Sequence, residues 1–335
     1  MGDLPEHVIS LNALSASLVI AVLAILVELV LGQMPAFRHV RWQVALRGFC
    51  QGLERRLNRH KRSDGARLIR GLLLCLTLLL PALFLGTLMT LFIGSLPPPI
   101  AAGLVSLLLA GGLRFGAAWS VAGALRQAVA AADRQRANRL IRAHGRIDPA
   151  AMDDHAVVRE AVELLARGWD RGLIAPLFWF LLFGLPGLFT LIVVQAADDV
   201  VGRGDQRTEA FGMVISRLDT ILHLLPARLS GLLLLGGLSL AKPGRLGAAL
   251  TSLRAAAKAR VMLNGRWALA PFAGGLDMSL AGPSKAMKQR AWIGDGTARL
   301  EPEAIGRAKI LVAFAGLLLA AALAAAFIGA VSVGL

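Results

Sequence analysis

Ionised side chains gather at three places beside long apolar runs of the chain. The first group is Glu163, Arg167, Asp170 and Arg171, which stand three and four positions apart directly before "GLIAPLFWFLLFGLPG". This spacing predicts one face of a helix, on which the four form either an intrahelical ladder of ion pairs or the edge of a substrate site. Ionisable groups beside a membrane segment are costly, so each is a functional hypothesis.

The second group is the pair Asp198 and Asp199 in "VVQAADDVVGRGD", at the end of an apolar run. Paired carboxylates at a membrane boundary suit a cation or a magnesium-bound phosphate. Carboxylates that are simply solvated at a helix end are the alternative interpretation.

The third group interrupts the apolar stretch "FGMVISRLDTILHLLPARL" with Arg217, Asp219, His223 and Arg228. Guanidinium groups in a pocket bind phosphate or carboxylate through paired hydrogen bonds. A surface ion pair of Arg217 with Asp219 is the alternative, and the pocket fits the four residues better.

No generic catalytic or metal-binding motif accompanies these groups. The chain lacks GxxxxGK[ST], GxSxG, HExxH and CxxC. The six histidines are scattered without ligand spacing, and Cys50 and Cys75 are interpreted as ordinary thiols. Neither a protein-bound zinc ion nor an iron–sulfur cluster is expected.

The composition indicates a membrane protein. The 335 residues are 56% hydrophobic with mean hydropathy +0.65, yet they carry a formal charge of +15. We predict an all-α, multi-pass protein of the bacterial inner membrane, with residues 1–335 as one integral membrane domain. Basic cytoplasmic loops and amphipathic helices on anionic lipid explain the charge. Nucleic-acid binding is not expected, because no recognition motif accompanies the charge.

Apolar windows predict about five or six membrane segments. They are Leu11–Gly32, Leu68–Gly94, Ile100–Leu113, Leu173–Ala197, Leu229–Ala241 and Ile310–Leu335. Four can cross a hydrocarbon core of about 30 Å, whereas the third and fifth are marginal. The first lacks the features of a cleaved signal peptide and is expected to remain as a span.

Lysine and arginine residues predict the orientation of these segments. They concentrate in 33–70, 114–171 and 242–309, which the positive-inside rule places in the cytoplasm. If all six windows cross, segment 196–228 and both termini lie outside. If the fifth does not cross, 196–228 returns to the cytoplasmic side.

The segment before the first group predicts a cytoplasmic helical hairpin. Its first helix is expected to end at Gly145. The second is expected to have Asp148 as N-cap, Pro149 at its first position and Gly168 as C-cap.

The order of these features resembles the CobD/CbiB family of membrane proteins, the adenosylcobinamide-phosphate synthases. The matching elements are Glu163, "GLIAPLFW" (172–179), "SRLD" (216–219), "PARL" (226–229), Asn264 with Trp267, "AGP" (281–283), "WIGD" (292–295) and "LEPEAI" (300–305). Near the N-terminus, "LGQMPAFRHV" with His39 is similar to a further family element. The match is collinear over most of the chain, and its order is more specific than any single element.

Several acids and amides of the family pattern are replaced. Arg167 and Gly168 stand where the family has Glu-Asn, and Arg171 stands for an Asp. Thr220 and His223 replace an Asp and an Asn.

The resemblance implies ATP- and magnesium-dependent amide ligation in cobalamin biosynthesis. Aminopropanol or its phosphate would be joined to the corrinoid propionate of adenosylcobyric acid. The implied catalytic residues are Glu163 as a base, Asp198 and Asp219. The implied phosphate- or substrate-binding residues are Arg217, Arg228, Asn264, Trp267 and His39. Asp198 and Asp199 are the implied magnesium ligands.

The expected partners are membrane lipid, the corrinoid and amino-alcohol phosphate substrates, and other enzymes of cobalamin assembly. The alternative function is that of a catalytically inactive CobD/AmpE-like membrane protein with a binding or regulatory role. The replaced acids favour this alternative, whereas the retained Asp198, Arg217 and Asp219 oppose it. A transporter is less favoured, because the two halves show no corresponding interrupted segments.

Overall fold

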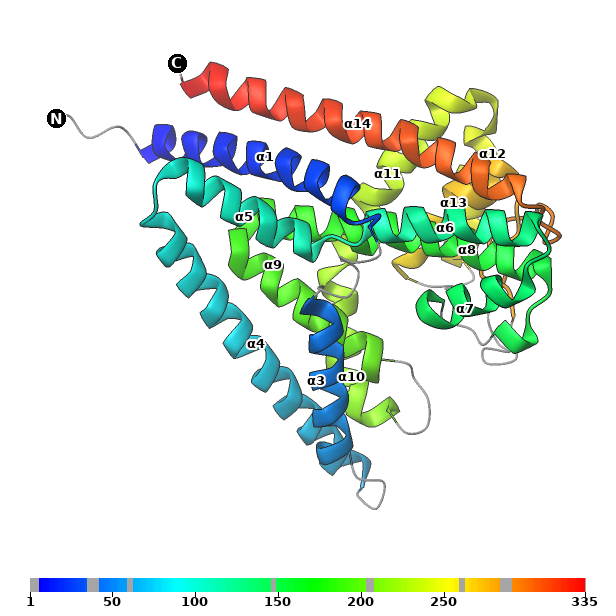
Figure 1. The fold of residues 1–335 in the computed structure, drawn as a ribbon, viewed down its shortest axis with the longest axis horizontal. Coiled ribbons are helices and arrows are strands. Elements are labelled where there is room, and N and C mark those ends of the chain that lie inside the picture. Colours follow the sequence, from blue (N-terminus) through cyan, green and yellow to red (C-terminus); the bar gives the residue numbers. More distant parts are fainter. Residues whose placement is uncertain are drawn as a thin grey trace. The chain divides into compact units, whose positions relative to one another are not determined.

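The structure is a computed structural model that describes residues 6–34, 42–58, 63–145, 149–202, 208–258, 263–283 and 291–334. Within these ranges the chain forms helices and two isolated β-bridges but no β-strand (Figure 1). The all-α prediction is therefore confirmed. The chain forms two compact units: unit 1 comprises 1–113, 175–224 and 325–335, and unit 2 comprises 114–174 and 225–324.

The apolar windows correspond to long helices. Among the residues that the structure describes, four helical runs are long and apolar enough to cross a membrane: Asp64–Gly94, Asp154–Val201, Leu224–Ala241 and Glu303–Ser332. A fifth is added if Pro98–Gly112 and Phe115–Ala130 form one bent span, and the apolar stretch Ser15–Leu31 is shorter. The marginal fifth window thus belongs to a longer helix, since that helix already begins at Leu224.

Unit 1 is built on two antiparallel helices, α4 and α9. Gly86 near the end of α4 lies against Pro186 early in α9, and an added Cβ would come 2.6 Å from the Pro186 Cα. Gly71 near the start of α4 packs against the Phe211 carbonyl in the same way. The helices of this unit are α1 (Glu6–Leu31), α3 (Trp42–Leu57), α4 (Asp64–Gly94), α5 (Pro98–Gly112), α9 (Ala175–Val201) and α10 (Glu209–Leu222).

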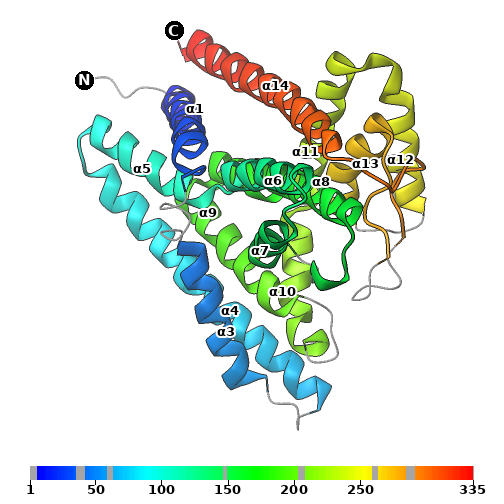
Figure 2. The same cartoon turned by 45° about the vertical axis from the view of Figure 1, so that its right-hand side comes forward.

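The end of α9 lies beside the basic segment 33–70. Arg47 of α3 forms an ion pair with Asp199, and α10 packs on α4 through Gly71 and Phe211. Both views show α3, α10 and the first turns of α4 together (Figure 1, Figure 2). The described parts of segments 33–70 and 196–224 therefore lie together in unit 1, a proximity that the six-crossing arrangement does not predict.

Helix α5 ends part-way along α9. Gly112 packs against Leu188 and Ile192, and Ile192 precedes Val201 by nine residues. At 1.5 Å per residue, α5 stops about 14 Å short of the end of α9 that pairs with α3. The third window does not reach the basic end of unit 1, in keeping with its marginal length.

The fourth window is broken rather than continuous. Gly184 has φ 62° and ψ −146°, a conformation that is almost restricted to glycine, and Pro186 follows it. The helical part before Gly184 is therefore separate in direction from the part that ends at Val201. Sequence periodicity shows only the apolar character of such a segment, so the break was not predicted.

Replacing Gly184 by alanine is expected to lower the free energy of unfolding by about 1–3 kcal/mol, because a side chain is strained at this φ and ψ. Gly103 in α5 is the matched control, since nothing lies within 4 Å of an added Cβ there. Thermal unfolding in detergent should show a lower midpoint for Gly184→Ala and an unchanged or higher one for Gly103→Ala. Equal midpoints for both variants would contradict the assigned backbone conformation.

The two cysteines behave as the sequence predicted. Both are free and buried, and Cys50 is part of an apolar core with Leu74, Phe211 and Ile215. Burial raises the pKa of the Cys50 thiol to about 11. The thiol therefore stays protonated at neutral pH and packs as a small apolar side chain.

Unit 2 consists of the remaining helices. They are α6 (Phe115–Ala130), α7 (Arg134–His144), α8 (Asp154–Trp169), α11 (Leu224–Ala241), α12 (Leu246–Lys258), α13 (Gly265–Leu276) and α14 (Glu303–Gly334), of which the last turns, from residue 325 on, belong to unit 1. A π-helical turn, Asp170–Ile174, follows α8.

The predicted hairpin is correct in outline and wrong in several details. Ala132, at φ 54°, separates α6 from α7, and Asp133 caps α7 by accepting the Arg136 N–H. Gly145 ends α7 as predicted. Pro149 begins a short 3-10 turn, the N-cap of α8 is Asp153, and Asp148 lies outside the described residues.

Gly168 is an interior residue of α8 rather than its C-cap. An added Cβ would lie 2.3 Å from the Ala118 Cβ, so glycine permits α8 to approach α6. The helical path continues through the π-turn, which explains why no cap is present at Gly168.

Candidate functional site

A groove of about 300 Å³ opens in unit 1 where the end of α9 meets α10. Gly212 lets these helices approach, because an added Cβ would lie 2.0 Å from the Val201 carbonyl oxygen. The α10 residues that line the groove recur every three or four positions and so share one helix face. The lining residues are Val201, Gly202, Thr208, Glu209, Gly212, Met213, Ser216, Arg217 and Thr220.

The groove combines one guanidinium with several hydroxyl groups. Arg217 is exposed, and no described residue pairs with it. Thr208, Ser216 and Thr220 add hydroxyls, of which Thr220 donates to the Ser216 carbonyl. A guanidinium beside hydroxyl donors suits the oxygens of a phosphate, and Glu209 adds one carboxylate to the lining.

The two carboxylates of the second group have different surroundings. Asp199 is ion-paired with Arg47. The Asp198 carboxylate lies against Gly202, where an added Cβ would come 1.9 Å from Oδ1. Over the described ranges, no cluster of three or more His, Cys, Asp or Glu could hold a metal ion. This donor set is too small for a metal held by protein groups alone, but it fits magnesium that brings phosphate ligands with it.

Asp219 of α10 is buried and is not among the residues that line the groove. Its Oδ1 lies 3.3 Å from His223 Nδ1, which also lies 2.8 Å from the Asp219 carbonyl oxygen. The other ring nitrogen of His223 lies 2.9 Å from Gln195 Nε2. Asp219, His223 and Gln195 thus form a buried polar chain, and the histidine at the family's Asn position is part of it.

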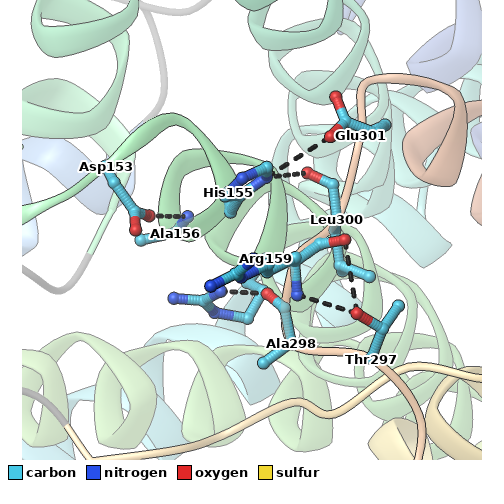
Figure 3. Close-up of polar contacts among 9 residues, drawn as sticks. Asp153, His155, Ala156, Arg159, Thr297, Ala298, Leu300 and Glu301 are labelled. Atoms are coloured by element: carbon cyan, nitrogen blue, oxygen red, sulfur yellow. Dashed lines mark hydrogen bonds and ion pairs between the residues drawn. The ribbon is translucent and has the colours of Figure 1, made fainter.

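In unit 2, one face of α8 contacts the backbone groups of Ala281, Ala298 and Leu300. His155 Nδ1 lies 3.0 Å from the Leu300 carbonyl, and Arg159 donates to the Ala298 carbonyl (Figure 3). Two turns from His155, Glu163 Oε1 accepts the Ala281 N–H at 2.8 Å. His155, Arg159 and Glu163 are four residues apart, so their side chains share one helix face and reach these three backbone groups.

In the first group of ionised residues, Arg167 of α8 forms a ladder of ion pairs along the helix. Arg167 lies 2.6 Å from the Glu160 carboxylate and 3.8 Å from that of Glu163. Both glutamates are almost fully buried. Asp170 is also buried, within the π-turn that follows. Arg167 therefore neutralises two acids that would otherwise be buried side by side.

Three predicted binding residues meet in unit 2. Arg228 of α11 donates to Asn264 Oδ1 at 3.3 Å, and its guanidinium carbon lies 5.4 Å from the centre of the Trp267 ring. Glu163 contacts the Ala281 segment instead. His39 lies outside the described residues.

Several residues of these sites were missed in the sequence. Thr208, Glu209 and Ser216 line the groove, and His155 and Arg159 contact the carbonyls of Leu300 and Ala298. Helical spacing was the available signal for His155 and Arg159, which are four residues apart, and for Glu209 and Ser216, which are seven apart, whereas Thr208 precedes α10 and carries no such signal.

Comparison with known proteins decides the family. A family model described as CobD/Cbib protein matches residues 21–312. The chain belongs to the CobD/CbiB family. The resemblance drawn from motif order is thereby confirmed, with all replaced positions inside the matched region.

Similar proteins carry the name "Cobalamin biosynthesis protein CobD". The protein from Sinorhizobium sp is 35% identical over 68% of this chain and 71% of its own length. That from Brucella anthropi is 38% identical over 41% of this chain and 42% of its own, and that from Brucella suis is 35% identical over 54% and 59%. The match thus spans about half the length of the two Brucella proteins. No solved structure matches this family member significantly.

Proposed function

We propose that this CobD/CbiB protein acts in cobalamin biosynthesis and joins an amino alcohol, or its phosphate, to a corrinoid carboxylate through an amide bond. The groove between α9 and α10 carries the proposal, since Arg217 and several hydroxyls line it and the Asp198 carboxylate lies against Gly202 of its lining. We place the end of unit 1 where α3 meets α9 in the cytoplasm, on the positive-inside rule, because ATP is available there. We further propose that the membrane is the bacterial inner membrane.

Each groove residue has a role in this proposal. Arg217 binds phosphate oxygens, and the hydroxyls of Thr208 and Ser216 orient them. Asp198 and Glu209 are the carboxylates that would hold magnesium together with nucleotide phosphates, and magnesium would neutralise charge on the transferred group. Asp219 supports α10 through His223 rather than touching the phosphate.

Contacts of Glu163 favour a positioning role over that of a base. One oxygen accepts the Ala281 N–H and the other faces Arg167. A buried carboxylate with both oxygens engaged holds the "AGP" segment in place, where Ala281 adopts φ 60°.

Glu163→Gln is expected to retain activity within about tenfold, because the amide oxygen can still accept the Ala281 N–H. Glu163→Ala is expected to lower the free energy of unfolding by about 1–3 kcal/mol, since a buried N–H loses its acceptor. Steady-state kinetics and thermal unfolding of both variants provide the measurements. If Glu163→Gln instead loses about 100-fold or more in kcat with unchanged folding, Glu163 acts as a base.

The alternative is an inactive family member with a binding or regulatory role. The first group supports this alternative. Arg167 and Gly168 stand where the family has Glu-Asn, and both have structural contacts instead: Arg167 pairs with Glu160 and Glu163, and Gly168 packs on Ala118.

A reconstituted assay separates the two functions. The full chain, purified in detergent, is given adenosylcobyric acid, ATP, magnesium and aminopropanol phosphate, and cobinamide phosphate is detected by mass spectrometry. Formation of product that requires ATP supports the ligase. A monodisperse, folded protein that forms none, while an intact relative does under the same conditions, supports the inactive alternative.

A further inference from the structure

Two cations from different helices meet in unit 2, where α6 lies beside the first turns of α14. Lys309 of α14 reaches across to α6, since its Nζ would lie 3.3 Å from a Cβ added at Gly123. Arg126 of α6 reaches across to α14 in return, since its Nη1 would lie 3.4 Å from a Cβ added at Gly306. On each helix the glycine precedes the cation by three residues, so both share one face. The two glycines therefore leave room for the two cations.

Trp119 fixes the position of Lys309. The Lys309 Nζ lies 4.2 Å from the centre of the Trp119 ring, which itself packs on Phe115 with the ring centres 5.8 Å apart. Trp119 stands four residues before Gly123 on α6, and so belongs to the same helix face. The ring attracts a cation but has no net charge, so the charge of Lys309 is oriented without being neutralised.

The two cations have no acidic partner in the part of the chain that the structure describes. No carboxylate there forms an ion pair with Arg126 or Lys309, and Glu303, one turn before Gly306 on α14, is exposed. The two positive charges are close enough to repel each other. Like charges held together cost free energy, and a bound anion would offset that cost.

Both cations stand where apolar helical stretches end. Lys309 is the last charged side chain of the chain, and Arg126 follows the uncharged stretch 115–125 of α6. Directly after Lys309, α14 exposes large apolar side chains seven residues apart, with Ile310 57% and Leu317 66% exposed. Basic residues at the end of a membrane helix lie at the depth of the lipid phosphates. An anion that reaches the two cations can therefore carry acyl chains.

We propose that Arg126 and Lys309 form a binding site for the phosphate of one anionic phospholipid, whose acyl chains lie along the exposed apolar face of α14. The Arg126 guanidinium donates paired hydrogen bonds to the phosphate oxygens, and the Lys309 ammonium adds a second positive charge. Such a site holds one lipid in a fixed place, in contrast to the general solvation that the bilayer gives any membrane protein. It lies apart from the groove of unit 1 and does not depend on ligase activity.

Native mass spectrometry of the full chain in non-ionic detergent, titrated with phosphatidylglycerol, tests the site. One phosphatidylglycerol molecule is expected to bind more tightly than phosphatidylcholine with the same acyl chains. Arg126→Gln and Lys309→Gln are each expected to weaken this binding by about fivefold, and the double variant by about 25-fold, because each removes one basic group near the lipid phosphates. Arg126→Lys, which keeps the charge, should lose less than about threefold.

The double variant with Arg139→Gln and Arg254→Gln is the matched control, since it removes two exposed arginines of the same unit and has the same net charge. It should keep phosphatidylglycerol binding within about twofold of the parent protein. Thermal unfolding separates lost binding from lost folding. Without lipid, the double variant with Arg126→Gln and Lys309→Gln is expected to unfold at the same or a higher temperature than the parent, because a repulsion is removed. With phosphatidylglycerol, only the parent and the matched control should show a rise.

Three results would overturn the proposal. The first is equal phosphatidylglycerol binding by the parent and by the double variant that lacks Arg126 and Lys309. The second is an equal loss in the matched control, which would mean general attraction of the lipid to a basic protein. The third concerns a soluble ligand: if inorganic phosphate at equal concentration raises the unfolding temperature of the parent as much as phosphatidylglycerol does, the site binds a free anion rather than a lipid.

Discussion

Replacing Arg167 by glutamate is expected to lower the free energy of unfolding by about 3–5 kcal/mol, the usual cost of leaving buried charges without their partner. Arg167 lies between the buried carboxylates of Glu160 and Glu163, so the substitution brings three acids together. Such a loss is a large part of the stability of a typical domain. Chemical denaturation in detergent, followed by tryptophan fluorescence, measures it.

Arg139→Glu on α7 is the control for the change of charge, because this arginine is exposed. It should alter the free energy of unfolding by less than about 0.5 kcal/mol. Arg167→Met, which removes the cation without adding an acid, should lie between the two. A stability of Arg167→Glu equal to that of Arg139→Glu would mean that the ladder does not stabilise α8.

Replacing Arg217 by glutamine is expected to lower kcat/KM for amide formation by about 100- to 1,000-fold, the range for one preorganised donor at a developing charge. Arg217 is exposed in the groove and pairs with no described residue, so its loss should leave the unfolding temperature unchanged. Product formation from adenosylcobyric acid under steady-state conditions gives the rate.

The matched control is Arg56→Gln, which removes an exposed arginine of α3 in the same unit. Its activity should stay within about twofold of the parent protein, since it does not line the groove. If Arg217→Gln and Arg56→Gln have equal kcat/KM values, the groove is not the phosphate site.

The all-α fold, the approximate number of membrane segments and the protein family could be predicted from the sequence, because they depend on patterns that extend over many residues. Apolar runs of membrane length and the order of short motifs survive the replacement of single residues. The site could be predicted only in part. Arg217 was recognised as a cation in an apolar helix, but its neighbours Thr208 and Glu209 come from another turn and carry no motif.

Other features depend on approach distances that no pattern encodes. Gly168 was predicted to end a helix, since glycine commonly does so, whereas contact with Ala118 is what requires it. Asp219 was predicted to be catalytic, whereas it is part of a buried polar chain with His223 and Gln195 that is complete only where α9 meets α10. Segments 33–70 and 196–224 lie together because Arg47 pairs with Asp199 and Gly71 packs on Phe211, and such long-range contacts cannot be predicted from hydropathy.

The ion pair of Arg47 with Asp199 joins residues 152 positions apart. A ribosome adds about 5–20 residues per second, so α3 is complete about 8–30 s before the end of α9 is made. During that interval the buried face of α3, including Cys50, has no α9 to cover it. The packing of α3 is therefore completed late in synthesis, once the end of α9 has been made.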